Sequence, residues 1–279
     1  MTKIAFKINE KVHEVSVEGS PAFAFGKAET LSSAITDITY HQAWYPKGFE
    51  VFDLLSVKEF EHLKQGITHS IKNLIEKELQ ISLPNFDLTK YHHIIKTDTD
   101  HFKIVSKTRD LFSGDFTFSV QSLIPSLEKF LGFQLIDINP KDETKMHIIV
   151  RINRPHSNDY NPPHKDIYEG VDGENYIPLF INFWIPICGV TENSALPISP
   201  ASHLIPENQI LRTFDGAVVA GNKYRVRMIK EWAGNNVLER AKVADGQVLV
   251  FSSHLIHGLA INDEEDLTRV ALEFRLFKK

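Results

Sequence analysis

Residues 161–166, which spell Asn-Pro-Pro-His-Lys-Asp, follow an apolar stretch at 146–152 that we expect to form a strand. Side chains two residues apart in extended backbone point to the same face, so His164 and Asp166 present an imidazole and a carboxylate side by side. A metal site of the facial-triad type needs a second histidine. The best candidate is His257. The sequence therefore predicts a metal site assembled from two distant segments.

A second histidine, His254, competes with His257 for the role of third ligand. It lies three residues earlier, so in a strand it would face the opposite side. Gly258 follows His257 directly and would let the backbone pass close to a bound group. These two features favour His257.

Arg269 lies twelve residues after His257 and begins an apolar run at 270–272. A buried guanidinium is costly unless it meets an anion, and its planar fork fits a carboxylate. We therefore expect Arg269 to bind an anionic ligand. The alternative is that it pairs with an acidic residue of the run 263–266.

The composition is ordinary for a soluble globular protein. The chain has 279 residues, a formal net charge of −5 and one cysteine, Cys188. The charge gives no reason to expect nucleic acid or an anionic membrane as a partner. A single cysteine excludes an internal disulfide, which suits a reducing cytoplasm. No apolar run approaches the ~18 residues of a membrane span, and we see no signal peptide. We expect a cytoplasmic monomer or homodimer.

The apolar pattern places helices early in the chain and strands later. We expect a hairpin at 3–17, interpreted as an ornament at a sheet edge, and mostly irregular chain at 18–48. Ser56 and Glu59 form a capping box that opens a long amphipathic helix. The other expected elements are a strand at 49–53, a second helix at 119–131, and strands at 146–152, 177–187, 248–252 and 269–276. This order favours an antiparallel β-core supported by helices.

Three further histidines, His92, His93 and His101, fall in a stretch without a clear period. Neighbouring residues of a strand face opposite ways, so His92 and His93 would make a poor chelate. We assign them a structural role. The irregular segments 92–118 and 203–236 are the expected substrate lids.

In combination, these segments resemble the phytanoyl-CoA dioxygenase-like branch of the 2-oxoglutarate oxygenases. The resemblance runs from about Gly48 to the C-terminus, and its order is more specific than any one piece. The pieces are the strand and capped helix after Gly48, a helix ending at Leu131-Gly132, His164-Lys165-Asp166, Phe183-Trp184-Ile185-Pro186-Ile187, Thr191 to Leu196, Pro200-Ala201-Ser202-His203, and His257-Gly258 with Asn262 and Arg269. Ser194 and Ala201 stand where the family usually has glycine.

This resemblance implies a mainly β fold with flanking helices, a double-stranded β-helix of the jelly-roll or cupin-like kind. It implies that His164, Asp166 and His257 bind iron(II). It also implies that 2-oxoglutarate chelates the iron while Arg269 holds its distal carboxylate. Three protein ligands leave three positions for 2-oxoglutarate and dioxygen. The whole chain would form a single oxygenase domain, comprising a poorly matched extension at 1–47, helical support at 48–140 and the β-core at 141–279.

Several other polar residues flank the expected site. Asn182 and Trp184 share one face of their strand, where Asn182 would bind either 2-oxoglutarate or nearby backbone. The candidates for substrate binding near the entrance are Arg151, Asn153, Arg154 and Tyr168. This many polar groups suggests a polar small molecule as substrate, such as an amino acid, a sugar or a decorated metabolite. A solvated loop would have the same composition.

The expected reaction oxidises an unactivated C–H bond and releases succinate and carbon dioxide. In related halogenases a small residue replaces the carboxylate ligand, whereas Asp166 is present here. Hydroxylation, or desaturation or cyclisation by the same oxidant, is therefore the expected outcome. The alternative is a non-oxygenase metal-binding protein of the cupin type, an isomerase or a sensor. Such a protein has no need of a clamp like Arg269.

Overall fold

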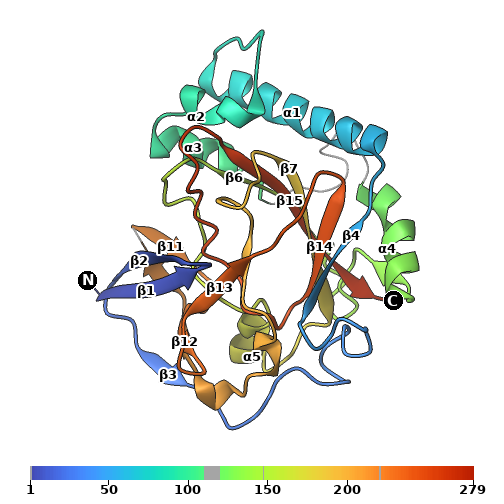
Figure 1. Cartoon of the computed structure of the whole chain (residues 1–279), viewed down its shortest axis with the longest axis vertical. Coiled ribbons are helices and arrows are strands. Elements are labelled where there is room, and N and C mark those ends of the chain that lie inside the picture. The colour runs from blue at the N-terminus through green and yellow to red at the C-terminus, as the bar shows by residue number, and fades with distance from the viewer. Residues whose placement is uncertain (1, 110–119, 147, 220) are drawn as a thin grey trace.

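The computed structural model describes residues 2–109, 120–146, 148–219 and 221–279. Strands fill its centre, and the two termini lie on opposite sides (Figure 1). The described helices are α1 (Val57–Leu79), α2 (Tyr91–Ile94), α3 (Asp98–Val105), α4 (Ile124–Leu131) and α5 (Tyr168–Glu174). The strands are β1 (Thr2–Ile8), β2 (Lys11–Glu18), β3 (Phe23–Phe25), β4 (Phe49–Asp53), β5 (Leu135–Ile136), β6 (Ile149–Asn153), β7 (Phe180–Cys188), β8 (Pro197–Ile198), β9 (Ile210–Thr213), β10 (Ala217–Val219), β11 (Asn222–Tyr224), β12 (Ile229–Trp232), β13 (Val237–Arg240), β14 (Gln247–Ser252) and β15 (Arg269–Lys278).

β7 lies in the middle of one antiparallel sheet, whose order is β4-β14-β7-β15-β5, with β6 also paired to β15. Every residue of β7 is buried. Because alternate residues of a strand point to opposite faces, Ile181, Phe183 and Ile185 join the core on the helical side. Trp184 belongs to a separate core on the other side. The alternation in β7 thus separates a packing face from a face that looks into the β-fold.

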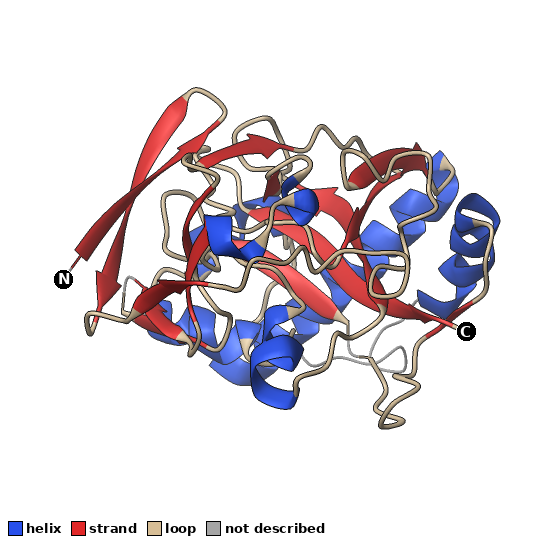
Figure 2. Cartoon of the chain, turned by 90° about the horizontal axis from the view of Figure 1, so that it is seen from below, coloured by secondary structure: helices blue, strands red, loops and turns tan. Residues whose placement is uncertain are grey.

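The first helix is specified by its sequence at both its start and its buried face. Ser56 accepts a hydrogen bond from the backbone of Glu59, and the Glu59 carboxylate accepts one from the backbone of Ser56. This capping box confirms the prediction. Leu63, Ile67 and Ile71 form the buried stripe that packs against the sheet. Figure 2 shows most of the helices on the lower and right-hand sides of the strands. None of the described helices has the length and apolar character of a membrane span.

Element boundaries differ from the predicted ones by a few residues. The second helix starts late: Val120–Leu123 is a 3-10 turn, and α4 follows with Pro125 in its first turn, where proline is tolerated. It ends at Gly132 in the left-handed conformation, φ 76°, as predicted. Ser119 and His147, which belong to a predicted helix and a predicted strand, lie outside the described residues.

The predicted N-terminal hairpin is confirmed, but its predicted place at a sheet edge is wrong. β1 and β2 pair with each other, and they also pair with β13 and β10. The order of this second sheet is β11-β10-β2-β1-β13-β8, so the hairpin lies in its middle. Phe6, Val15 and Val17 are buried there. The hairpin is therefore part of the β-core.

The segment 203–236 is not the irregular lid that we predicted. It contains β9, β10, β11 and β12, and β9 pairs with both β12 and β3 in a third sheet. Strands of three or four residues are too short to give a readable alternation in the sequence. The other predicted lid, 92–118, contains α2 and α3, and its residues 110–118 lie outside the described part of the chain.

Two curled sheets face each other across a shared apolar core. Trp184 and Leu249 of the first sheet pack with Leu196 and Ile198 on the opposite side. His257, which follows β14, forms an isolated bridge with Ile198 of β8. This arrangement confirms the predicted mainly β fold with flanking helices, a double-stranded β-helix.

Candidate metal centre

The two histidines of the predicted triad are joined by their backbones. The His164 N–H donates to the His257 carbonyl at 2.9 Å, and the reverse bond is 3.1 Å long. Gly258 makes this close approach possible: its φ is +124°, and a Cβ there would lie 2.6 Å from the carbonyl oxygen of Pro162. We expected Gly258 to make room for a bound group. Instead, it makes room for neighbouring backbone.

Each imidazole is oriented by a backbone carbonyl. Nδ1 of His164 lies 2.7 Å from the Pro162 oxygen, and Nδ1 of His257 lies 3.0 Å from the Leu255 oxygen. Carbonyls only accept, so both Nδ1 atoms carry the proton and both Nε2 atoms keep a free lone pair. These Nε2 atoms lie 3.5 Å and 3.6 Å from the carboxylate of Asp166. The spacing is close to the ~3 Å that separates adjacent ligand atoms about a first-row divalent ion.

Asp166 is held by two side chains from the sheet. Arg275 donates to one carboxylate oxygen at 2.6 Å, and Asn182 donates to the other at 2.8 Å. Burial alone would raise the pKa of Asp166, but the positive charge of Arg275 beside the carboxylate holds that pKa well below its usual range. Burial lowers the pKa of His257 to about 4. The site therefore offers an ionised carboxylate and a neutral imidazole at neutral pH, the states that bind metals.

The predicted ligands fit one divalent ion. The ligand atoms of His164, Asp166 and His257 all lie within 4.8 Å of one another. Two nitrogens and one oxygen on one side of an ion match the facial arrangement of non-haem iron(II) sites. His254 is not part of this group, because its Nε2 lies 2.8 Å from the carbonyl of Thr36.

Arg269 lies at the start of β15 and is almost completely buried, at 1% exposure. Its Nη2 donates to Oδ1 of Asn153 at 2.5 Å, while Nε and Nη1 have no hydrogen-bond partner among the described residues. Burial lowers its pKa to about 10. The alternative pairing with the acidic run is not formed by Asp263 or Asp266, which pair with Arg240 and Lys90. Two unused donors on a buried cation are suited to a carboxylate.

These groups line one cavity of about 140 Å³. Among the lining residues are His164, Asp166 and His257 together with the inward side chains Arg151, Asn153, Asn182, Trp184, Phe251, Arg269, Glu273 and Arg275. The volume exceeds by several fold the roughly 10–15 Å³ that one water needs on this measure. The cavity thus has room for a small ligand between the metal ligands and Arg269.

The remaining predicted site residues divide into two groups. Arg151 lines the cavity and forms an ion pair with Glu273 at 2.7 Å. Arg154 and Tyr168 do not line it: Arg154 is bound to Asp159 at 2.9 Å, and the Tyr168 hydroxyl donates to Glu207 at 2.7 Å.

Sequence reasoning missed the contact of Arg275 with Asp166 and the inward position of Glu273. Counting by two from Arg269 along its predicted strand reaches both residues, so the alternation of β15 contained the signal. Asn182, expected to contact 2-oxoglutarate or backbone, instead bonds Asp166.

The model of the phytanoyl-CoA dioxygenase family matches residues 51–266, more than three quarters of the chain. The chain therefore belongs to this family of iron(II)- and 2-oxoglutarate-dependent oxygenases, and its cofactors are iron(II), 2-oxoglutarate and dioxygen. The matched range includes the three predicted metal ligands and ends before Arg269. Among curated proteins, none is similar enough to count as a match.

Solved structures are similar to this chain at low identity. EctD from S. alaskensis, solved with 2-oxoglutarate and 5-hydroxyectoine, is 10% identical, with coverage of 95% of this chain and 86% of that one and a TM-score of 0.46. AviO1 from Streptomyces viridochromogenes Tue57 is 16% identical, with coverage of 90% and 96% and a TM-score of 0.44. EvdO2 from Micromonospora carbonacea var. aurantiaca, complexed with 2-oxoglutarate, is 12% identical, with coverage of 92% and 94% and a TM-score of 0.45.

Proposed function

We propose that this oxygenase hydroxylates, desaturates or cyclises an unactivated C–H position of a small polar metabolite, with release of succinate and carbon dioxide. The observation that carries the proposal is the position of Arg269. Arg269 lines the same cavity as His164, Asp166 and His257, and its Nε and Nη1 have no hydrogen-bond partner in the part of the chain that the structure describes. A non-oxygenase metal protein of the cupin type would have no use for such a buried cation.

In this proposal, His164, Asp166 and His257 hold iron(II) on one side and leave the other side to 2-oxoglutarate and dioxygen. The bound iron with its cosubstrate supplies the oxidant for C–H cleavage. Because a carboxylate occupies the third ligand position, no place is left there for a halide, which favours hydroxylation and related outcomes over halogenation.

Arg269 would bind the distal carboxylate of 2-oxoglutarate through a two-donor fork, formed by the second hydrogen of Nη2 and one of the two unpaired donors, Nε or Nη1. Asn153 fixes the guanidinium through Nη2, so the other donors are already oriented when the cosubstrate arrives. The guanidinium carbon of Arg269 lies 5.7 Å from the ring centre of Trp184, and this fully buried ring shields the guanidinium from water. Both effects strengthen recognition of a carboxylate in a low-dielectric site.

Asn182 and Arg275 are positioning residues for Asp166, since each bonds one of its oxygens. The substrate would enter past Arg151 and Glu273, which form an ion pair at the cavity wall. A paired cation and anion can hydrogen-bond a substrate that carries hydroxyl, amine or carboxylate groups, which supports a polar metabolite.

We also propose that residues 1–279 act as one oxygenase domain. The hairpin β1–β2 supports this reading, because it supplies two strands in the middle of the second sheet.

The first test is anaerobic spectroscopy of the purified protein with iron(II) and then 2-oxoglutarate. We expect a weak visible charge-transfer band that needs both additions and disappears in Asp166→Ala. The matched control is Asp215→Ala, because Asp215 is an exposed aspartate outside the cavity. It should keep the band. Bound iron without a band in the unsubstituted protein would favour the cupin-type alternative, and full turnover by Asp166→Ala would refute the assigned ligand.

A further inference from the structure

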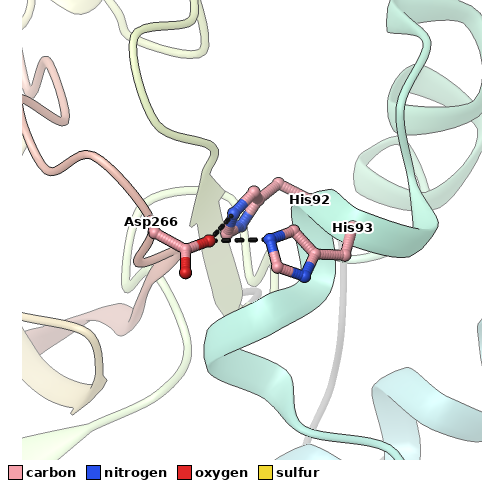
Figure 3. A group of neighbouring side chains, drawn as sticks. All are labelled: His92, His93 and Asp266. Carbon is pink, nitrogen blue, oxygen red and sulfur yellow. Dashed lines mark hydrogen bonds and ion pairs between the residues drawn. The ribbon is translucent and has the colours of Figure 1, made fainter.

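His92 and His93 do not lie in a strand, so the reason for calling them a poor chelate is wrong. They lie in α2, and both rings face Asp266 (Figure 3). Their Nε2 atoms are 2.9 Å and 2.6 Å from the same oxygen, Oδ1. Ligand atoms of the three residues all lie within 4.8 Å of one another. Outside the iron centre, the geometry thus brings together a second set of two imidazoles and a carboxylate.

Neighbouring groups hold these ligand atoms in place. Nδ1 of His92 lies 2.7 Å from the hydroxyl of Thr268, which leaves Nε2 to face Asp266. A bond of this kind at the far nitrogen is typical of metal-binding histidines. Lys90 bonds the other carboxylate oxygen of Asp266, Oδ2, at 2.5 Å. Thr268 and Lys90 thus hold one imidazole and the carboxylate of this set in place.

We propose that His92, His93 and Asp266 form a second metal site, which takes a late divalent transition metal such as zinc(II). Two imidazoles and one carboxylate are ligands that zinc prefers. The side chains of His93 and Asp266 are 57% and 56% exposed, so water completes the coordination from the open side.

The side chains need only small movements to accept the ion. Bond lengths of about 2.0–2.2 Å place the ligand atoms of tetrahedral zinc roughly 3.3 Å apart. The present Nε2–Oδ1 distances of 2.9 Å and 2.6 Å must therefore widen by less than about 1 Å. His93 and Asp266 are exposed enough to move by that amount, whereas His92 is held by Thr268.

The site would fasten α2 to the chain that leads into β15. Thr268 already donates its N–H to the carbonyl of Thr89 at 2.8 Å, and Lys90 donates to the carbonyl of Asp266 at 2.6 Å. Zinc would add a further link between the same two segments, directly before Arg269. It would stabilise the start of the strand that carries this arginine.

The test counts zinc bound to the full-length chain after equilibrium dialysis at micromolar free zinc. Asp166→Ala/His257→Ala removes the iron centre, and we expect this variant to retain one zinc per chain. Adding His93→Ala should abolish that zinc, and adding Asp266→Asn should weaken its binding at least tenfold. Adding His69→Ala, a change at an exposed histidine of α1, is the matched control and should retain the zinc.

Zinc should also raise the melting temperature of the Asp166→Ala/His257→Ala variant but not that of the same variant carrying His93→Ala. The proposal is overturned if the first variant retains no zinc. It is equally overturned if zinc remains after His93→Ala while circular dichroism shows a native fold. In either case the three side chains form only the hydrogen-bonded network of the metal-free protein.

Discussion

Arg269→Met should separate cosubstrate binding from fold stability. The guanidinium is 1% exposed, and burial lowers its pKa from the ordinary 12.5 to about 10. That lowering corresponds to about 3 kcal/mol against the charged form in the fold. The group is charged at neutral pH in both folded and unfolded chains, so the penalty holds throughout the neutral range and fades only as the pH rises through about 10.

The substitution removes this penalty but also breaks one hydrogen bond. Oδ1 of Asn153 would lose its partner Arg269, at a cost of about 1–3 kcal/mol. The two effects oppose each other. The unfolding free energy of the cofactor-free protein should therefore change by less than about 2 kcal/mol.

Cosubstrate binding should respond very differently to Arg269→Met. Each lost charge-assisted hydrogen bond to 2-oxoglutarate is worth about 1.5–3 kcal/mol. Two such bonds correspond to a loss of affinity of at least roughly 100-fold. Urea unfolding followed by circular dichroism measures the first quantity, and anaerobic calorimetric titration of 2-oxoglutarate into the iron(II) protein measures the second.

Arg212→Met is the matched control, because Arg212 is equally buried but paired. It bonds both oxygens of Asp172, at 2.5 Å and 2.9 Å. Its removal leaves Asp172 with only the longer contact to Arg227, at 3.6 Å, and should cost about 3–5 kcal/mol of stability, with unchanged 2-oxoglutarate affinity. The reasoning is refuted if Arg269→Met destabilises the protein as much as the control does, or if it weakens 2-oxoglutarate binding less than fivefold.

Three further predictions concern separate parts of the molecule. Asn182→Ala and Arg275→Ala should each lower iron(II) affinity by roughly 10–100-fold in anaerobic titration, because each orients an oxygen of Asp166; unchanged affinity in both would show that neither positions the ligand. Burial raises the pKa of the Cys188 thiol to about 12, so iodoacetamide at pH 8 should label it only after unfolding, and rapid labelling of the native protein would contradict this. Burial lowers the pKa of His101 to about 4, below the ordinary 6.5, so the unfolded chain binds this proton first as the pH falls. The free energy of unfolding should therefore fall by up to about 3 kcal/mol as the pH drops from 6.5 to 4. His101→Gln should flatten that part of the stability profile measured by urea unfolding, and superimposable profiles would count against the assignment.

Local periodicity was enough to predict much of the first sheet and its helix. Ser56 with Glu59 marked the start of α1, and the strands β4, β7, β14 and β15 were found within three residues of their bounds. The approach of His164 to Asp166 follows from the spacing of two residues. The choice of His257 over His254 rested on strand alternation and on Gly258, and the resemblance implied the same ligand.

The features that the sequence did not reveal depend on contacts between segments far apart in the chain. The hairpin β1–β2 has the alternation of any exposed ribbon, and nothing in it shows that β13 and β10 flank it. The convergence of His92 and His93 on Asp266 depends on the helix α2. This helix has four residues, too few to produce a recognisable helical period in the sequence. Both features arise from packing between segments far apart in the chain.

The inward face of β15 carries buried charges, and these explain why cosubstrate binding should stabilise the fold. It carries Arg269, Glu273 and Arg275, whereas the opposite face is apolar and packed against helices. Buried charges are costly without partners. Glu273 is paired with Arg151, and Arg275 with Asp166. Arg269 alone has only a neutral amide among the described residues, with two donors unused. The charge that this face leaves without an ionic partner among the described residues is therefore the one that a carboxylate of 2-oxoglutarate would neutralise. Cosubstrate binding should then stabilise the native state as well as prepare the reaction.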